Sequence, residues 1–317
     1  MKFPSRLTAA LALPGWLLAT GGCASIPAGR SAVDSVRVAG ARDMDTGDLA
    51  SKLATAESPK FLGLLRGIVF DYEVFDASVL QRDLARVEHY CRAHGFLEAH
   101  ARAARVVHTS TDHVRVEIVV DEGPPTLNGR VAVQGLDGVP PDIAAAVRTA
   151  ADKALPVGAR FDEDAYKKAQ TDVGRALTDR GYAYATVRAD SQADLATHTV
   201  DYAFTLAPGP PAVFGAVTIV GLDPDAAGPA KQELDEAPLR RTMNVKPGDT
   251  YSTATLEAAT QALLDLEVMG AVQILPQLSE PPTGVVPLIV RIEPAKLRES
   301  RLGGGLELDQ ILSLIHI

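Results

Sequence analysis

Histidine is the residue type whose pattern most suggests a chemical role in this sequence, because five of the seven histidines fall in one stretch. They are His89, His94, His100, His108 and His113. Imidazole is a common ligand of zinc and copper, so such a group raises the question of a metal site. The successive spacings of 5, 6, 8 and 5 residues fit no compact ligand motif on one helix or strand. We interpret these residues as surface histidines and predict no metal site.

Motifs for nucleophilic, hydrolytic or phosphate chemistry do not occur in the sequence. It contains no G-x-S-x-G, H-E-x-x-H or C-x-x-C motif. Gly303-Gly304-Gly305 lacks the lysine and the helix of a phosphate-binding loop. The acidic run Asp162-Glu163-Asp164 falls where we expect a helix to begin, and carboxylates stabilise that end of a helix. We therefore predict that the protein is not an enzyme and has no catalytic residues and no cofactor.

The two cysteines, Cys23 and Cys91, predict no disulfide framework. Cys91 falls on the apolar face of an expected helix, so we predict a buried, inert thiol. Cys23 follows Gly22 at the end of a run of small residues, where bacterial lipoproteins carry their acylated cysteine. It is our lipidation candidate, and ordinary cleavage nearby is the alternative.

The amino terminus has the parts of an export signal. Lys2 and Arg6 precede the apolar residues 7–19, which are too few to span a membrane as a helix. We predict a signal peptide at residues 1–22 and a tether at residues 23–32. The net charge of −9 argues against nucleic acid as a partner, because little in the chain would neutralise phosphates.

A long repeat organises the rest of the chain. The string V-x-V-x-G, an alternating strand closed by a turn glycine, occurs at Val36–Gly40 and Val131–Gly135, and again as V-x-I-x-G at Val217–Gly221. Repeats this far apart indicate tandem domains rather than a solenoid.

A helix follows each of these strands. In the first repeat Leu80, Leu84, Val87 and Cys91 recur at helical spacing, and Arg82, Asp83, Arg86, Glu88 and Arg92 lie elsewhere on the helix. We expect the helix to begin after Phe75-Asp76 and to stop at Gly95 in a Schellman motif, with Phe96 folding back. The corresponding starts are Phe161-Asp162 and Tyr251-Ser252, and the corresponding stops are Gly181 and Gly270.

A shorter helix and a strand pair complete each repeat. Pro141–Ala151 is the clearest short helix, and Val114 to Val120 is the clearest alternating strand. The sequence therefore predicts an α+β fold of three βααββ domains at residues 33–125, 126–211 and 212–295.

This unit resembles the POTRA (polypeptide-transport-associated) domain. V-x-V-x-G, the helix ending in glycine and an aromatic residue, and the closing Glu122-Gly123-Pro124 carry the resemblance. Three units in an exported chain resemble the periplasmic part of the BamA/TamA superfamily of outer-membrane assembly factors, and their number favours the TamA-like branch.

In that family a transmembrane β-barrel follows the last domain. Residues 296–310 resemble the start of a barrel, because Arg301–Asp309 alternates as an opening barrel strand would. The resemblance then implies a barrel that is truncated in this sequence. Residues 311–317 do not continue the alternation, and we interpret them as a non-native tail.

The resemblance and the fold imply one mode of action. A three-stranded sheet has edge strands, which bind extended peptides as an added strand. We expect binding at the strands Ala101–Val107, Ala185–Ala189 and Ala271–Leu275. The candidate residues are Ala101, Ala103, Ala185, Val187, Val272 and Ile274.

The predicted role is that of a periplasmic arm at the outer membrane of a Gram-negative cell. It would bind unfolded outer-membrane protein precursors and pass them to the barrel, with a periplasmic or inner-membrane protein as a further partner. The alternative is a self-contained periplasmic scaffolding or binding protein, with a lipid anchor at Cys23.

The first repeat also contains extra residues between its strand and its helix stop. They include an apolar segment from Phe61 to Tyr72. Two interpretations stay open: the segment covers the core, or it contacts membrane, precursor or partner through Phe61, Leu64 and Leu65.

Overall fold

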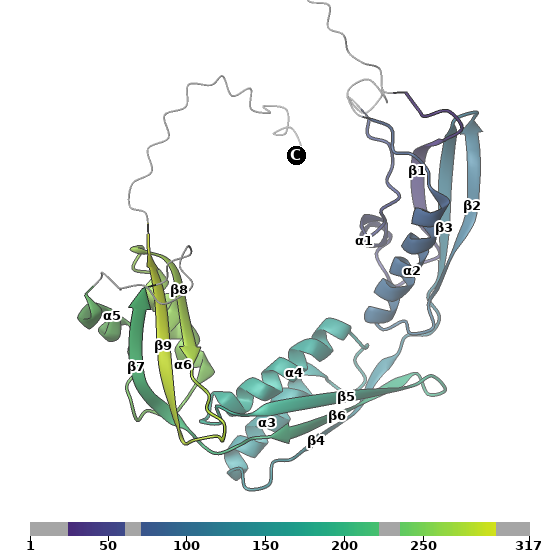
Figure 1. The fold of residues 1–317 in the computed structure, drawn as a ribbon. Coiled ribbons are helices and arrows are strands. Elements are labelled where there is room, and N and C mark those ends of the chain that lie inside the picture. Colours follow the sequence, from purple (N-terminus) through teal and green to yellow (C-terminus); the bar gives the residue numbers. More distant parts are fainter. Residues whose placement is uncertain (1–24, 61–70, 222–234, 296–317) are drawn as a thin grey trace, which may run out of the picture. The chain divides into compact units, whose positions relative to one another are not determined.

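The computed structural model describes residues 25–60, 71–221 and 235–295. Within these residues the strands form three separate three-stranded sheets, each with two helices in the same stretch of the chain, and Figure 1 shows helices beside each sheet. We call each sheet with its two helices a module. The first module contains β1 (Ala32–Ala39), α1 (Thr46–Ser51), α2 (Ala77–Ala93), β2 (His100–Ser110) and β3 (His113–Asp121).

The other modules have the same order of elements. The second contains β4 (Leu127–Gln134), α3 (Pro141–Ala154), α4 (Glu163–Thr178), β5 (Thr186–Asp194) and β6 (Thr199–Ala207). The third contains β7 (Val213–Gly221), α5 (Glu236–Met243), α6 (Thr253–Leu264), β8 (Met269–Pro276) and β9 (Val285–Pro294). The predicted βααββ order is therefore confirmed in all three modules. The predicted barrel strand, signal peptide and tail lie outside the described residues.

The strand order is also the same in each sheet. It is β1-β3-β2, β4-β6-β5 and β7-β9-β8, so the last strand of each module lies in the middle. The middle strand is parallel to the first strand and antiparallel to the second. The two helices provide the long connection that a parallel pair requires, and a hairpin joins the antiparallel pair.

One face of each sheet is buried under its helices. In β3 the buried residues Val114, Val116, Ile118 and Val120 alternate with polar or partly exposed ones. β6 buries Val200, Tyr202, Phe204 and Leu206 in the same way, and β9 buries Val286, Leu288, Val290 and Ile292. We call the opposite face of each sheet its outer face.

Two of the three predicted helix stops are confirmed. Gly95 has a φ of 92°, and the N–H of Phe96 donates to the carbonyl of Cys91 at 3.0 Å, as a Schellman motif requires. Gly181 has a φ of 99°, and the N–H of Tyr182 donates to the carbonyl of Leu177 at 3.2 Å.

The third predicted stop, Gly270, is wrong. α6 ends at Leu264, and Gly270 lies inside β8. The left-handed residue is Glu267, with a φ of 56°, and its N–H donates to the carbonyl of Leu264 at 3.0 Å. The chain thus turns before it reaches the glycine, because a non-glycine residue adopts the required conformation.

Each confirmed stop also bonds to the segment that begins the following module. The carbonyl of Gly95 accepts the N–H of Thr126 at 2.7 Å, and the carbonyl of Thr126 accepts the N–H of Phe161 at 2.9 Å. The corresponding bonds, at 2.7 and 3.1 Å, join Gly181 to Ala212 and Ala212 to Tyr251. A Cβ atom on Gly95 would lie 2.6 Å from the carbonyl oxygen of Phe161, so this position requires glycine.

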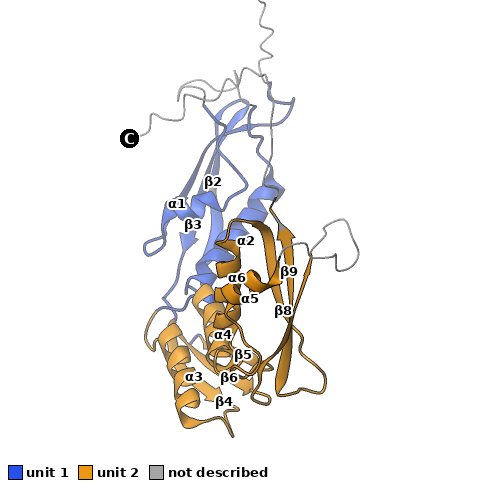
Figure 2. Cartoon of the chain, turned by 90° about the vertical axis from the view of Figure 1, so that its left-hand side faces the viewer, with its two compact units in different colours: residues 1–126, 160–163, 195–198 blue, residues 127–159, 164–194, 199–317 orange. Residues whose placement is uncertain are grey.

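The chain divides into two compact units (Figure 2). One consists of residues 1–126, 160–163 and 195–198, and the other contains the rest of the chain, including the second and third sheets.

Inside the second unit, Tyr184 bonds to the loop between β8 and β9. Hydrogen bonds from Ser279 and Thr283, through their hydroxyl and backbone N–H groups, lower the pKa of Tyr184 to about 8.

Candidate peptide-binding edges

The first strand of each hairpin lies at an edge of its sheet. β2, β5 and β8 each end the strand order, so one side of each strand faces away from its ladder partner. Five candidate residues lie in these strands: Ala101, Ala103, Val187, Val272 and Ile274. Ala185 precedes β5, which begins at Thr186. Peptide binding at these residues stays a prediction.

The candidate residues in the strands share the helix-facing side. Ala101 and Ala103 stand opposite the buried residues Val120 and Ile118 of β3. Val187 stands opposite Leu206, Val272 opposite Ile292 and Ile274 opposite Val290. Residues paired across a ladder point to the same face of the sheet. These apolar side chains would therefore contact the inward-facing side chains of an added strand.

Sequence reasoning missed two arginines on the outer face of β2. Arg102 stands opposite Val119, and Arg105 stands opposite Glu117. Strict alternation would place these two arginines on opposite faces, but the register shifts between Ala103 and Arg105 and brings both to the outer face. The arginines are visible in the sequence, whereas the β-bulge between them is not.

Glu88 of α2 occupies the β2 edge at Ala101, and the part of the edge beyond Ala101 is free for another strand. The N–H of Ala101 donates to Glu88 Oε1 at 3.0 Å, so this N–H points away from β3. Glu88 is held in place by Arg92, whose Nη2 lies 3.0 Å from Glu88 Oε2. Because alternate residues of a strand point their N–H groups to the same side, the N–H of Ala103 also points outward. Ala103 and Val106 are exposed.

The extra segment of the first module begins and ends at the same place in the fold, because the residues on either side of it both bond to Val33. The N–H of Val33 donates to the carbonyl of Glu73 at 2.8 Å, and the carbonyl of Val33 accepts the N–H of Ser58 at 2.9 Å. In the second module the same two bonds, at 2.7 and 2.8 Å, join Asn128 to the adjacent residues Ala159 and Gly158. Residues 59–72 are therefore inserted where the second module has one peptide bond.

The third module has the same arrangement as the second. There Phe214 bonds to Asp249 and Gly248, at 2.8 Å in both cases. The three contact-loop candidates, Phe61, Leu64 and Leu65, lie outside the described residues. Their predicted contact with membrane, precursor or partner stays a prediction.

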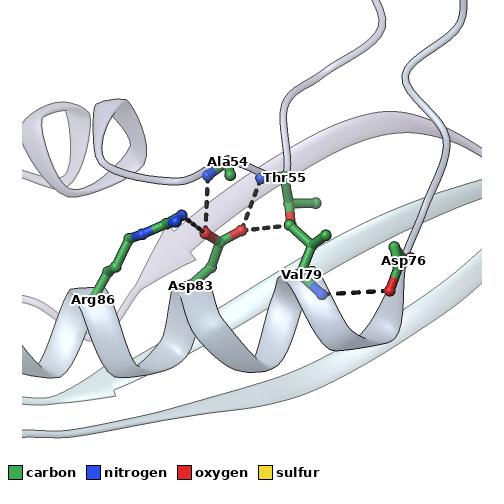
Figure 3. A network of polar contacts seen from close by, with 6 residues as sticks. All are labelled: Ala54, Thr55, Asp76, Val79, Asp83 and Arg86. Atoms are coloured by element: carbon green, nitrogen blue, oxygen red, sulfur yellow. Dashed lines mark hydrogen bonds and ion pairs between the residues drawn. The ribbon is translucent and has the colours of Figure 1, made fainter.

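A buried carboxylate holds the chain just before this insertion (Figure 3). Asp83 of α2 has an exposed fraction of 0%. Its carboxylate accepts the N–H of Ala54 at 2.9 Å, and the N–H and hydroxyl of Thr55 at 2.7 and 2.6 Å. Arg86 lies one turn along the same helix and donates to it at 2.6 Å. The helical spacing predicts that Asp83 lies outside the apolar face, and this prediction is wrong because Asp83 is fully buried.

The donors around Asp83 decide its charge state. Burial is the largest single influence and raises the pKa of this carboxyl group. The hydroxyl of Thr55, two backbone N–H groups and Arg86 act in the opposite direction, and together they hold the pKa below its usual value. Asp83 is thus an ionised anchor for residues 54 and 55.

Cys91 and His113 have structural surroundings that account for them. Cys91 is fully buried, as predicted, and burial, with a smaller influence from Glu122 and Glu88, raises the pKa of its thiol to about 11. His113 Nδ1 lies 2.8 Å from Asp34 Oδ1. In residues 25–60, 71–221 and 235–295 no three His, Cys, Asp or Glu side chains are placed to share a metal ion.

Two further points concern the membrane. No helix in the described ranges has the length and hydropathy needed to cross a bilayer. Cys23, the lipidation candidate, lies outside the described residues.

Comparison with known families gives a match that covers the first module. Residues 31–123 match the POTRA family model, described as "Surface antigen variable number repeat". Comparison with curated proteins gives no match.

Several solved structures are similar to the chain. POTRA domains 3–5 of Haemophilus influenzae BamA are 16% identical, with a TM-score of 0.49, over 84% of this chain and 99% of that chain. The N-terminal domain of Omp85 from Thermosynechococcus elongatus is 20% identical, with a TM-score of 0.33, over 84% and 98% of the two chains. POTRA domains 1–3 of Omp85 from Anabaena are 17% identical, with a TM-score of 0.32, over 84% and 97%.

Proposed function

Because the first module is a POTRA domain, we propose that this chain binds extended segments of unfolded proteins by adding them as a strand to the β2 edge. The observation that carries the proposal is the direction of the N–H of Ala101, which points away from β3 toward Glu88. Beyond it Ala103 and Val106 are exposed, and the N–H of Ala103 points to the same side as that of Ala101. Such an edge supplies backbone hydrogen bonds with little demand on sequence.

The proposed clients are precursors of outer-membrane proteins. Such precursors consist of alternating strands, which are suited to pairing with a sheet edge. In this proposal the modules lie in the periplasm of a Gram-negative cell and pass the segments to a β-barrel in the outer membrane. The TamA-like branch is our proposal for the kind of assembly factor. The alternative is a self-contained periplasmic scaffold with a lipid anchor at Cys23, which shares the binding mode but does not pass the segments to a barrel.

The β1 side of the first sheet is a less suitable edge for the same purpose. Both backbone groups of Val33 are already bonded, to Glu73 and Ser58, and Ala32 forms a bridge with Val74. Part of that edge is therefore occupied by the chain itself. This asymmetry favours β2 as the strand that binds a client.

A proline on the open side of β2 tests the proposal. Ala103→Pro removes an N–H that points outward and places a ring there, while the bonds to β3 remain. With a labelled peptide of about ten alternating apolar and polar residues, the length of one membrane strand, we expect roughly tenfold weaker binding in fluorescence anisotropy.

Ala103→Val is the matched control, because it changes the side chain and keeps the N–H. We expect it to bind as the unmodified chain does, and circular dichroism checks that both variants are folded. Equal binding by the proline variant would rule out strand addition at β2.

A further inference from the structure

The three edge strands differ in the side chains that they present on the outer face. On β2 the outer residues opposite β3 include Arg102, Arg105 and Val107. The outer residues of β5 include both signs of charge: Thr186, Arg188, Asp190 and Gln192. Those of β8 are uncharged: Ala271, Gln273 and Leu275. Only β2 thus presents a positively charged edge.

The basic character continues across the first sheet. Arg115 of β3 is the neighbour of Val107, and Arg37 of β1 pairs with Glu117. The acidic residues on this face are Glu117, Asp121 near the end of β3, and Asp34 of β1, whose carboxylate bonds to His113 and Thr109. Four arginines therefore share the outer face with three carboxylates, in a chain whose net charge is −9.

The two arginines on β2 are available to a ligand. Both are exposed, and among the described residues no carboxylate lies within ion-pair distance of Arg102 or Arg105. The register pairs Arg105 with Glu117 across the ladder, but the two side chains do not form an ion pair. A carboxylate arriving from the open side would therefore meet unpaired guanidinium groups.

Strand addition at β2 fixes where the side chains of a bound segment lie. An added strand runs about 4.8 Å from β2, and its side chains alternate between the two faces with a period of two. On the helix side they meet Ala101, Ala103 and Val106, and on the outer side they meet Arg102 and Arg105. Directly opposed side chains of opposite charge attract, and like charges repel.

We propose that the first module selects extended segments in which apolar residues alternate with aspartate or glutamate. The apolar residues face α2, and the carboxylates face the two arginines. This inference rests on the proposed function, because it requires a strand at the β2 edge. It adds a chemical preference to a binding mode that by itself accepts many sequences.

The preference is measured with three peptides of about ten residues that share the same alternating apolar positions. The intervening positions are glutamate, glutamine or lysine. Each of the two opposed charge pairs on the exposed edge should change the affinity roughly two- to fivefold. We therefore expect the glutamate peptide to bind about tenfold more tightly than the lysine peptide at low salt. The difference shrinks as salt rises, because the charges are exposed.

The double variant Arg102→Glu and Arg105→Glu tests the assigned residues. We expect it to prefer the lysine peptide. The matched control is the double variant Arg82→Glu and Arg148→Glu, which changes the net charge equally at two exposed helix positions outside β2. The control keeps the preference for glutamate if the two arginines on β2 cause it.

The outcomes separate the inference from the proposed function. If the three peptides bind equally and Ala103→Pro weakens all of them, strand addition stands and the charge preference is wrong. If the glutamate preference survives in the Arg102→Glu and Arg105→Glu variant, the preference comes from elsewhere and the inference is again wrong. If Ala103→Pro changes nothing, the proposed function fails, and the inference fails with it.

Discussion

The first and second modules differ in how they hold the segment before their main helix. The shared bonds to Val33 and Asn128 align Ser58 with Gly158, and therefore Thr55 with Leu155. The aligned helix starts, Phe75 and Phe161, pair Asp83 with Ala169 in the same way. All four side chains are buried.

The first module thus has a hydrogen-bonded Thr–Asp pair where the second has leucine and alanine. The third module follows the second, with Val245 and Ala259, both buried. The polar pair occurs in the module whose next residues are the insertion. One βααββ frame therefore accepts either kind of contact, and we infer that the directional bonds of Asp83 fix the chain where an insertion begins.

A large loss of stability is expected from removing Asp83 alone. Asp83→Ala leaves two backbone N–H groups and the hydroxyl of Thr55 without their acceptor, which costs about 2–4 kcal/mol of unfolding free energy. Adding Thr55→Leu recreates the apolar pair of the second module, and we expect it to restore at least half of the loss. Urea unfolding, with hydrogen exchange to assign the first module, measures both.

The reverse substitution, a buried carboxylate introduced into the second module, tests the same difference between the two modules. Ala169→Asp places a carboxylate at a buried position of the second module, where a leucine stands in place of Thr55. We expect a loss of about 3 kcal/mol or more. If Ala169→Asp is tolerated and Asp83→Ala is neutral, the two modules do not depend on matched pairs.

A smaller effect is expected from removing the insertion. Deleting residues 59–72 and making Ser58→Gly recreates the turn of the second module, in which Gly158 has a φ of 80°. Since both bonds to Val33 can still form, we expect a change below about 1 kcal/mol in the stability of the first module. The same deletion with Ser58 retained is the control, and it should be less stable by about 1 kcal/mol because serine must adopt a left-handed conformation.

This experiment also decides between the two interpretations of the apolar segment. If Phe61, Leu64 and Leu65 cover the core, the deletion should cost several kcal/mol, since each buried side chain of this size contributes about 1.5–3 kcal/mol. Retained folding with lost peptide or membrane binding would support the contact interpretation.

The smallest effect concerns pH. The folded pKa of Asp83 lies below its unfolded value of 3.8, so its ionised form contributes stability above that pH. The contribution is lost as the pH falls through the folded pKa. We therefore expect the unfolding midpoint of the unmodified chain to fall more steeply below about pH 4 than that of Asp83→Asn. Parallel curves would show that Asp83 does not carry this dependence.

Features with a local cause could be predicted from the sequence. Gly95 and Gly181 follow a run of helical spacing and precede an aromatic residue, so the helix stop can be recognised from neighbouring residues. The alternation in β3 identifies the buried face for the same reason. Repetition of such local signals along the chain was enough to give the order of elements in all three modules.

Features that depend on distant partners could not be predicted. Asp83 is buried because Ala54 and Thr55 supply its donors, and no spacing within α2 indicates that. The bulge after Ala103 moves Arg105 to the outer face, and only the pairing with β3 shows it. Gly270 failed as a helix stop because Glu267 takes the left-handed conformation first.

The bonds from Gly95 to Thr126 and from Thr126 to Phe161 determine which residues around them can be substituted. They join main-chain atoms alone, and Gly181, Ala212 and Tyr251 form the same bonds with different side chains at two of the three positions. The side chains at the positions of Thr126 and Phe161 can therefore differ without altering these main-chain hydrogen bonds. At Gly95 and Gly181 the positive φ constrains the residue type, whereas the edges and loops of the modules can differ in sequence on the same frame.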